Sequence, residues 1–325
     1  MLFDNHNRPI QYLRLAVTDR CNLRCQYCMP VEGIQYLPKQ SLMTFEEIER
    51  LVTVMAGLGI TKVRVPGGEP FLRKDLMQLL GSIRSINGIQ DIHLTTNGLL
   101  AIDHLDELVQ LGIQSVNLSL DTLNPDRFHR ITRRPDFEKT WSAYQHFRAA
   151  GIQVKINCVV MEGINTEDII PMVELTREKD TTVRFIEEMP FNGTGKRSER
   201  LSWDHHRIVD HIGQHYGELI PVFGQSSDTA KNFRIPGYEG VFGIIAAYSR
   251  TFCGTCNRIR VTAQGILKTC LYDNGVLNVR DLMREGCSDE DLHQALINAF
   301  MNRPKNGFEA EASRPVNASM STIGG

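Results

Sequence analysis

The feature that most constrains the fold is an alternation of short β-rich runs with longer segments of helical period, from residue 13 to about residue 188. The β-rich runs cover residues 13–18, 62–66, 91–96, 115–120, 153–160 and 182–187. The helical segments cover residues 45–59, 75–86, 102–111, 137–150 and 166–179. The first is predicted to begin after Thr44, which can form a capping box with Glu47. Such βα units build a parallel sheet. The pattern therefore predicts an α/β fold, either a doubly wound sheet or an open, partial (βα) barrel of six units.

The period breaks down after Met189, where PFNGTGKRSERLS has the composition of a boundary loop. We therefore predict two domains, residues 1–200 and 201–325. The smaller C-terminal part is predicted to be α+β, with helices over 203–216, 278–285 and 289–302 beside short strands. The last twenty residues show no packing pattern, so composition alone predicts a frayed tail.

Charge and hydropathy exclude several classes of protein. With 36 basic and 38 acidic side chains the formal charge is −2, so no global field draws the chain to nucleic acid or to an anionic membrane. No apolar run reaches the roughly 18 residues of a membrane span, and residues 1–30 lack the pattern of a signal peptide. We therefore expect a cytoplasmic protein with neither a nucleic-acid nor a membrane partner. Its eight cysteines then indicate metal or redox chemistry.

Three cysteines form a first triad, Cys21, Cys25 and Cys28, in a CxxxCxxC loop directly after the first predicted strand. Ligands of parallel sheets bind at the carboxyl ends of strands. Three thiolates fit a four-iron cluster with one iron left open to a small molecule. The alternative is a structural zinc site, but zinc prefers four ligands and the loop holds no histidine.

A second triad consists of Cys253, Cys256 and Cys270. It predicts a second iron–sulfur cluster with an open iron, while a zinc site completed by Cys287 remains the competing interpretation. Arg258 and Arg260 occupy alternate positions of a predicted strand, so both point to one face, where two guanidinium groups can clamp a phosphate.

Four further cations lie within predicted strands: Arg14, Arg64, Lys155 and Arg184. A buried charge without a partner is costly, so these side chains require an anion. The anion is either a bound ligand or an ion-pair partner, for which the candidates are Glu69, Glu187 and Glu188.

The first triad, together with GGEP at residues 67–70, resembles the radical S-adenosylmethionine superfamily, whose fold is a partial (βα) barrel. Further motifs follow in order along the chain: TTNG at 95–98, SLDT at 119–122, EEMPFNG at 187–193, CGTCNRIRVT at 253–262 and a terminal IGG. With YLRLAVTDRCNLRCQYCMP at 12–30, this set resembles the GTP 3′,8-cyclase family of molybdenum cofactor biosynthesis, over nearly the whole chain.

The resemblance implies a lyase that converts GTP to (8S)-3′,8-cyclo-7,8-dihydroguanosine 5′-triphosphate. One [4Fe-4S] cluster would cleave S-adenosylmethionine to an adenosyl radical, which removes the hydrogen at C3′ of GTP, and the carbon radical would attack C8 of guanine. A second [4Fe-4S] cluster would hold the guanine and supply the reducing electron. The resemblance also implies a protein reductant, a downstream cyclic pyranopterin monophosphate synthase and a homodimer.

The resemblance assigns the site residue by residue. The first triad binds the first cluster and the second triad binds the second, and the residues given catalytic roles are Cys21, Cys25, Cys28, Arg258 and Arg260. The residues implied to contact S-adenosylmethionine are Tyr27, Gly68, Ser119 and Met189. The residues implied to bind GTP are Arg14, Arg64, Thr95, Lys155, Arg184, Arg258, Ile259 and Arg260. In this family a Gly-Gly terminus, here Gly324 and Gly325, inserts into the active site.

Pro66 departs from the family pattern, because a threonine is expected before GGEP and proline removes one backbone donor. Two other functions stay open. A radical enzyme that modifies a peptide would not need so many basic groups in its barrel, and a non-catalytic metal-binding sensor would not need an open iron.

Overall fold

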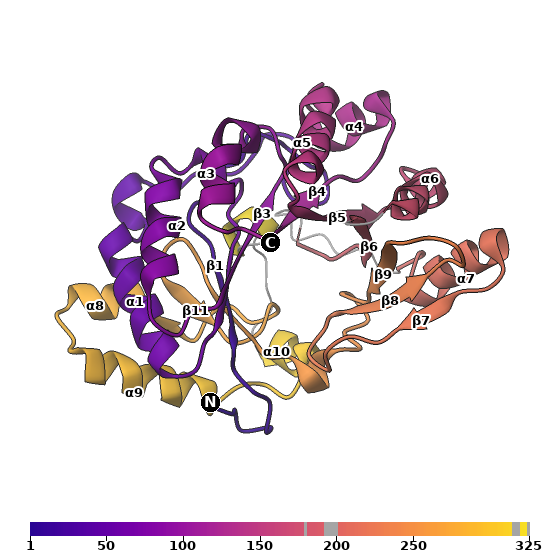
Figure 1. Cartoon of the computed structure of the whole chain (residues 1–325). Helices are drawn as coiled ribbons and strands as arrows, with labels where there is room; N and C mark the ends of the chain where they lie inside the picture. Colours follow the sequence, from indigo (N-terminus) through magenta and orange to yellow (C-terminus); the bar gives the residue numbers. More distant parts are fainter. Residues whose placement is uncertain (179–180, 192–200, 314–318, 324–325) are drawn as a thin grey trace. The chain divides into compact units, whose positions relative to one another are not determined.

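The computed structural model describes residues 1–178, 181–191, 201–313 and 319–323, and the chain forms two compact units (Figure 1). Unit 1 consists of Met1–Asn22, Gly33–Thr95 and Cys253–Gly325. Unit 2 consists of Leu23–Glu32 and Thr96–Phe252. Both the first and the last segments of the chain thus belong to unit 1.

The sheet of unit 1 runs in the order β12-β11-β10-β1-β2-β3. Its strands are β1 (Tyr12–Leu15), β2 (Lys62–Val65), β3 (Asp91–Thr96), β10 (Arg258–Val261), β11 (Ile266–Lys268) and β12 (Leu277–Asn278). Strands β10, β1, β2 and β3 are parallel, whereas β11 and β12 are antiparallel additions at the edge. A strand from late in the sequence therefore pairs directly with the first strand.

The α-helices in the described residues of this unit are α1 (Phe45–Gly57), α2 (Leu76–Ser85), α8 (Val279–Arg284), α9 (Asp289–Phe300), α10 (Gly307–Ser313) and α11 (Met320–Ile323). The expected start of α1 is confirmed, because Glu47 N donates to Thr44 Oγ1 at 3.2 Å and Thr44 N donates to Glu47 Oε2 at 2.8 Å. This capping box satisfies two amides that the first helical turn leaves without partners. Helix α1 then buries Leu51 and Val52 completely.

Unit 2 has the same plan, with the strand order β4-β5-β6-β9-β8-β7. Its strands are β4 (Ser115–Ser119), β5 (Gln153–Val160), β6 (Thr181–Glu187), β7 (Ile220–Val222), β8 (Ala230–Arg234) and β9 (Val241–Ile245). Strands β4, β5, β6 and β9 are parallel, and β8 and β7 are antiparallel at the edge. Its helices are α3 (Leu105–Gln110), α4 (Pro125–Thr132), α5 (Phe137–Ala149), α6 (Ile169–Glu174) and α7 (His205–Tyr216).

All six predicted strands of the βα repeat are confirmed as β1 to β6. Helix α4 was not predicted, although its start signals stand in the sequence: Asn124 Oδ1 accepts from Arg127 N at 2.9 Å, and Pro125 occupies the first helical position. The predicted helix over 102–111 begins as a 3₁₀ turn, Ala101–His104, before α3. The predicted helix over 166–179 is in fact α6 between the 3₁₀ turns Thr166–Asp168 and Leu175–Arg177.

The prediction of a frayed tail is wrong for residues 319–323. Ser319, Ser321 and Ile323 are buried, and helix α11 forms here although composition shows no packing pattern. Burial depends on tertiary context, which the composition of a segment does not reveal.

The predicted division at residue 200 stays a prediction, because residues 192–200 lie outside the described part of the chain. Among the helices of the described ranges, none combines the length and apolar character needed to cross a membrane.

A carboxylate at the end of α6 ties together two aromatic side chains of unit 2. Glu174 Oε1 accepts hydrogen bonds from the hydroxyl groups of Tyr216 and Tyr238, and Glu174 Oε2 accepts from Arg177 Nε at 2.5 Å. Burial alone would raise the pKa of Glu174, but these hydrogen bonds outweigh it and lower the pKa from 4.5 to about 2. The carboxylate is thus stabilised in the folded state.

We predict a distinct pH signature for Glu174→Gln. A carboxyl pKa lowered on folding contributes stability that is complete above its ordinary value of 4.5 and is lost as the pH falls towards 2. The melting temperature of the variant should therefore fall below that of the parent at pH 7, and the gap should narrow below pH 4.5. Circular dichroism melts across this range measure the gap. Glu178→Gln, which removes an exposed ion pair with Arg148, serves as control and should show no comparable gap. A constant gap for Glu174→Gln would contradict the assignment.

Candidate active site

The loop after β1 carries Cys21, the first member of the first triad, in unit 1. Tyr36 donates its hydroxyl proton to Cys21 O at 3.2 Å. The GGEP turn lies directly against this loop, because Gly68 N donates to Thr18 O at 2.9 Å and Glu69 N donates to Arg20 O at 2.7 Å. The GGEP turn is therefore hydrogen-bonded to the backbone of the residues just before Cys21.

Gly68 is required by this close approach. A Cβ atom at Gly68 would lie 2.3 Å from Arg20 O and 2.6 Å from Arg20 C. Those atoms belong to the backbone immediately before Cys21, so they cannot move aside like a flexible side chain. Pro66 sits before this turn and accepts from Val17 N at 3.2 Å through its carbonyl, a contact that needs no amide of its own.

The other two members of the first triad lie in unit 2, in a tight turn in which Cys28 N donates to Cys25 O at 2.9 Å. Between them, Tyr27 donates its hydroxyl proton to Asp121 Oδ2 at 3.0 Å. Burial raises the pKa of Tyr27 well above its ordinary value and raises that of Asp121 to about 7. Asp121, the third residue of the SLDT motif, thus positions Tyr27, a role that the sequence analysis did not assign.

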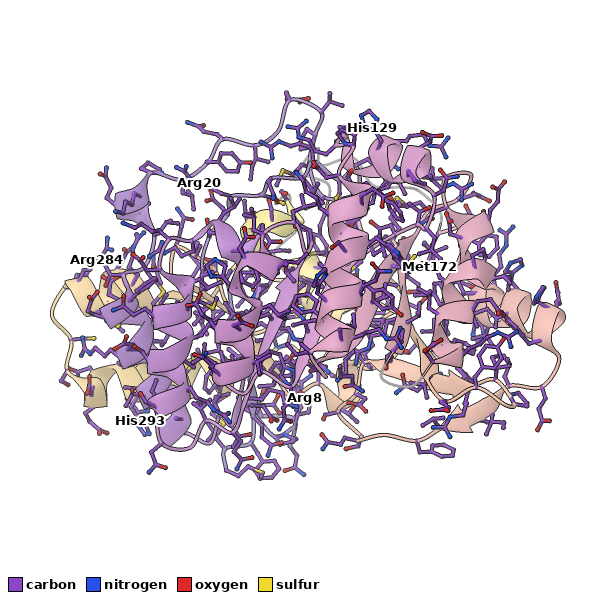
Figure 2. The ribbon with its side chains drawn as sticks, turned by 45° about the horizontal axis from the view of Figure 1, so that its top comes forward. Arg8, Arg20, His129, Met172, Arg284 and His293 are labelled. Atoms are coloured by element: carbon purple, nitrogen blue, oxygen red, sulfur yellow. The ribbon has the colours of Figure 1, made fainter. Side chains whose placement is uncertain are left out.

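Topology brings the second triad to the other end of β1. Because β10 runs parallel to β1, with Tyr12 in register with Arg258, Cys256 lies beside the amino end of β1. The antiparallel strand β11 returns to the same edge and delivers Cys270 two residues after its last residue, Lys268. In unit 1 the second triad therefore lies at the amino end of β1, whereas Cys21 follows its carboxyl end, and Figure 2 shows Arg20, after β1, and Arg8, before it, well apart.

The thiols of the second triad influence one another. Burial raises the pKa of Cys270 to about 11, and the nearby thiols of Cys256 and Cys253 add to the increase. Burial also acts to raise the pKa of Cys256, but Arg258 and Arg303 outweigh it and the net shift is downward. A metal ligand must be a thiolate, so this environment favours ligation by Cys256.

All eight cysteines are free thiols. Within the described residues, no three His, Cys, Asp or Glu side chains are gathered around a point that one metal ion could occupy. Cys158 is buried in β5, and burial raises the pKa of its thiol. Cys287 offers its carbonyl oxygen to Arg50 Nη2 at 2.6 Å.

A row of guanidinium groups crosses the sheet of unit 1. Arg14 in β1 is in register with Arg64 in β2 on one side and with Arg260 in β10 on the other. Residues in register on neighbouring strands about 4.8 Å apart point to the same face. Arg258 lies two residues before Arg260 and therefore shares this face, as does Lys268, which pairs with Arg260 across β10 and β11. Lys268 is not among the site residues predicted from the sequence.

Electrostatics show what this row costs. Burial lowers the pKa of Arg14 well below its ordinary value, and the charges of Arg260 and Arg64 lower it further. Burial likewise lowers the pKa values of Arg64 and Arg260. Among the described residues Arg14 has no carboxylate partner, and its Nε atom is buried without a hydrogen bond. Like charges side by side on one face of a sheet repel one another, and an anion that carries several negative charges would offset this repulsion.

The proposed site residues Ser119, Lys155 and Arg184 share one face of the sheet of unit 2. Ser119 in β4, Asn157 in β5 and Arg184 in β6 are in register, and Lys155 lies two residues before Asn157 on the same face. The Oδ1 atom of Asn157 is buried without a hydrogen bond in the described structure. Asn157 was missed from the sequence, although its distance of two residues from Lys155 in a strand is the signal that would have found it.

The ion-pair alternative fails for Glu187. Its carboxylate accepts from His205 N at 2.8 Å and His205 Nδ1 at 3.0 Å, and from Ser249 N at 2.7 Å and Ser249 Oγ at 2.8 Å. In the described chain no lysine or arginine is among its partners, so Glu187 does not neutralise Arg184. Glu69 accepts from Phe71 N at 3.3 Å, and burial raises the pKa of Glu188.

The remaining assignments are placed as follows. Thr95 lies in β3 two residues after His93, which is in register with Arg64, so Thr95 shares the face of the arginine row. Ile259 is buried on the opposite face of β10. Met189 is half-buried just after β6. Gly324 and Gly325, and the end of the EEMPFNG motif, fall outside the described residues.

Two family models match the chain along most of its length. Residues 15–176 match the Radical SAM superfamily, and residues 181–309 match Molybdenum Cofactor Synthesis C. Among solved structures, SuiB of Streptococcus suis bound to S-adenosylmethionine superposes with a TM-score of 0.62 over 95% of this chain and 69% of that chain, at 18% identity. The fold is therefore that of the radical SAM class, as predicted.

Relatives by sequence narrow the class. The chain is 38% identical to GTP 3′,8-cyclase of Alkaliphilus oremlandii over 99% of both chains. It is 40% identical to Molybdenum cofactor biosynthesis protein 1 of Dictyostelium discoideum over 94% of this chain and 49% of that protein. The chain spans about half the length of this relative and of its animal counterparts. It belongs to the GTP 3′,8-cyclase family.

We predict that Gly68→Ala disrupts the first triad. The added Cβ must displace the backbone before Cys21, which should lower the free energy of unfolding by about 1–3 kcal/mol and reduce iron incorporation by the first triad. Gly57→Ala is the matched control, because no atom lies within 4 Å of its Cβ at the end of α1. Chemical denaturation and iron analysis compare the two variants. Equal behaviour would show that Gly68 has room for a side chain.

Proposed function

We propose that this chain is a radical S-adenosylmethionine lyase that converts GTP to (8S)-3′,8-cyclo-7,8-dihydroguanosine 5′-triphosphate, the first step of molybdenum cofactor biosynthesis. The observation that carries the proposal is the in-register row of Arg14, Arg64 and Arg260, because guanidinium groups side by side on one face of a sheet suit the several negative charges of a triphosphate. Membership of the GTP 3′,8-cyclase family supports the same substrate.

The first triad fits a [4Fe-4S] cluster that leaves one iron to S-adenosylmethionine, since three half-buried thiols stand in one loop after β1. When bound, this pair supplies an adenosyl radical by one-electron cleavage of the sulfonium. The chain's own residues position it: Gly68 brings backbone rather than a side chain to the cofactor, and Asp121 orients the Tyr27 ring. Ser119 and Met189 complete the proposed contacts with S-adenosylmethionine.

The residues proposed to bind GTP are Arg14, Arg64, Thr95, Arg258, Ile259 and Arg260 of unit 1, and Lys155 and Arg184 of unit 2. The guanidinium groups bind phosphate oxygens and hold the ribose in place for hydrogen removal at C3′. Arg258 and Arg260 also lie beside the second triad in the sequence, so GTP bound to these two residues would lie close to that triad.

The second triad fits a second [4Fe-4S] cluster on the chemistry of its donors, because positive charges favour the thiolate of Cys256 and β11 brings Cys270 to the same edge of the sheet. Held there, the cluster supplies a binding point for guanine and an electron for the last step. We further propose a protein reductant, a downstream cyclic pyranopterin monophosphate synthase, a homodimeric state and a cytoplasmic location, where reducing conditions keep eight thiols free.

Two competing functions make different predictions under anaerobic conditions with dithionite and S-adenosylmethionine. A non-catalytic metal sensor would release no 5′-deoxyadenosine at full iron content. A peptide-modifying enzyme would release 5′-deoxyadenosine but would not convert GTP. Formation of the cyclised nucleotide, identified by mass spectrometry, supports the proposal over both.

We predict that Arg14→Met raises the KM for GTP by about 10- to 100-fold, since a charge-assisted hydrogen bond contributes roughly 1.5–3 kcal/mol. The physical reason is that Arg14 is the central member of the row. Steady-state kinetics with varied GTP measure the change. Arg84→Met, which alters an exposed arginine on α2 of the same unit, is the control and should leave KM unchanged. An unaltered KM in Arg14→Met would remove Arg14 from the substrate site.

We predict that Cys256→Ser abolishes the GTP product and lowers the iron content from about eight to about four per chain. The matched control is Cys287→Ser, which should retain both product and iron. Metal analysis also tests the zinc alternative: about four irons with one zinc in the parent, and loss of that zinc in Cys287→Ser, would establish zinc at the second triad instead.

A further inference from the structure

A buried arginine outside every motif contacts the second triad. Arg303 follows helix α9 and is 4% exposed. Its Nη2 atom donates to Cys256 Sγ at 3.9 Å and to Arg258 O at 3.1 Å, and its Nη1 atom donates to Cys256 O at 3.3 Å. Its Nε atom donates to Thr269 O at 3.3 Å, just before Cys270. One guanidinium group therefore connects both segments that carry the second triad.

Asp4 orients this guanidinium group from the first residues of the chain. Its Oδ2 atom accepts from Arg303 Nη1 at 3.0 Å and from Arg8 Nε at 2.7 Å. Arg8, labelled in Figure 2, donates in turn to Cys253 O at 3.1 Å. Asp4 and its two arginines thus hold backbone carbonyls at or next to each cysteine of the second triad.

The charges of this group do not balance. Two buried arginines share one buried aspartate, so one positive charge is left over in an interior with little access to water. A buried charge requires a counter-charge. The atom that Arg303 reaches with its remaining N–H group is the sulfur of Cys256, and a thiolate there supplies the missing negative charge.

We propose that Arg303, oriented by Asp4, is a positioning residue for the iron–sulfur group of the second triad: it aligns the two cysteine-bearing segments and raises the reduction potential of that group. The proposal rests on the second cluster of the proposed function. A reduced iron–sulfur group carries more negative charge than the oxidised form, so a positive charge and an N–H group directed at a ligand sulfur stabilise the reduced state.

The charge argument predicts shifts of opposite sign for two substitutions. Arg303→Met removes a positive charge and should move the midpoint potential of the second group to a more negative value. Asp4→Asn removes a negative charge at nearly constant shape and should move the potential to a more positive value. Arg303→Lys keeps the charge but loses the planar fork, so its potential should stay near that of the parent while less iron is bound.

The experiment uses full-length protein in which alanine replaces the three cysteines of the first triad, so that only the second group remains. Each variant is reconstituted anaerobically, its iron is counted and its potential is measured by a redox titration followed by electron paramagnetic resonance. Arg50→Met is the control, because Arg50 also pairs with an aspartate and donates to a cysteine carbonyl, that of Cys287. It should change neither iron content nor potential.

The outcomes separate the two proposals. If the parent background binds no iron–sulfur group, the second cluster and the role of Arg303 fall together. If it binds one and Asp4→Asn shows the parent's potential or a lower one, only the role of Arg303 is overturned. A purely structural role would reduce iron content in both charge variants without shifts of opposite sign. Should Arg303→Met fail to fold, Asp4→Asn and Arg303→Lys still decide the question.

Discussion

The proposed function depends most on three guanidinium groups that lie side by side on one face of the sheet of unit 1. Arg14, Arg64 and Arg260 occupy the same position on three neighbouring parallel strands, so each lies beside a like charge. Hydrogen bonding between the strands enforces this arrangement, because the register cannot shift by one residue without turning buried Leu13 and Leu15 to the other face. The fold accepts this repulsion, which the triphosphate of the proposed substrate would offset.

The buried charged side chains of the chain differ in whether their polar atoms have partners within the protein. Glu187 accepts four hydrogen bonds, and Asp4 is shared by two arginines, so both carboxylates are fully used inside the protein. Arg14, by contrast, retains a buried Nε atom without a partner in the described structure. A satisfied buried charge stabilises the native arrangement, whereas an unsatisfied one costs free energy that a ligand can recover.

The parallel pairing of β10 with β1 brings residues of the proposed substrate site and of the proposed second cluster together in unit 1. It places Arg258 and Arg260 in the arginine row and sets Cys256 at the amino end of β1, while Cys21 follows its carboxyl end. The antiparallel strand β11 then returns the chain to deliver Cys270. The Asp4–Arg303 contacts join this edge to the first residues of the chain, so distant segments converge on the second triad.

The amino-acid sequence by itself determined the six βα strands, the α/β class, both cysteine triads and most of the cationic positions, because these depend on local period, spacing and residue chemistry. The predictions did not include Asp121, Asn157, Lys268 or Arg303, since each acquires its role from a partner on another element. Asp121 stands in the SLDT motif, but the motif does not show that Tyr27 is its partner. Helix α4 and the buried residues of α11 were missed, the first because its capping signals are short and the second because composition alone does not reveal burial. Only the tertiary structure decided which charges lie side by side and which find partners, because register between strands far apart in sequence is set by backbone hydrogen bonds and core packing, neither of which a linear pattern encodes.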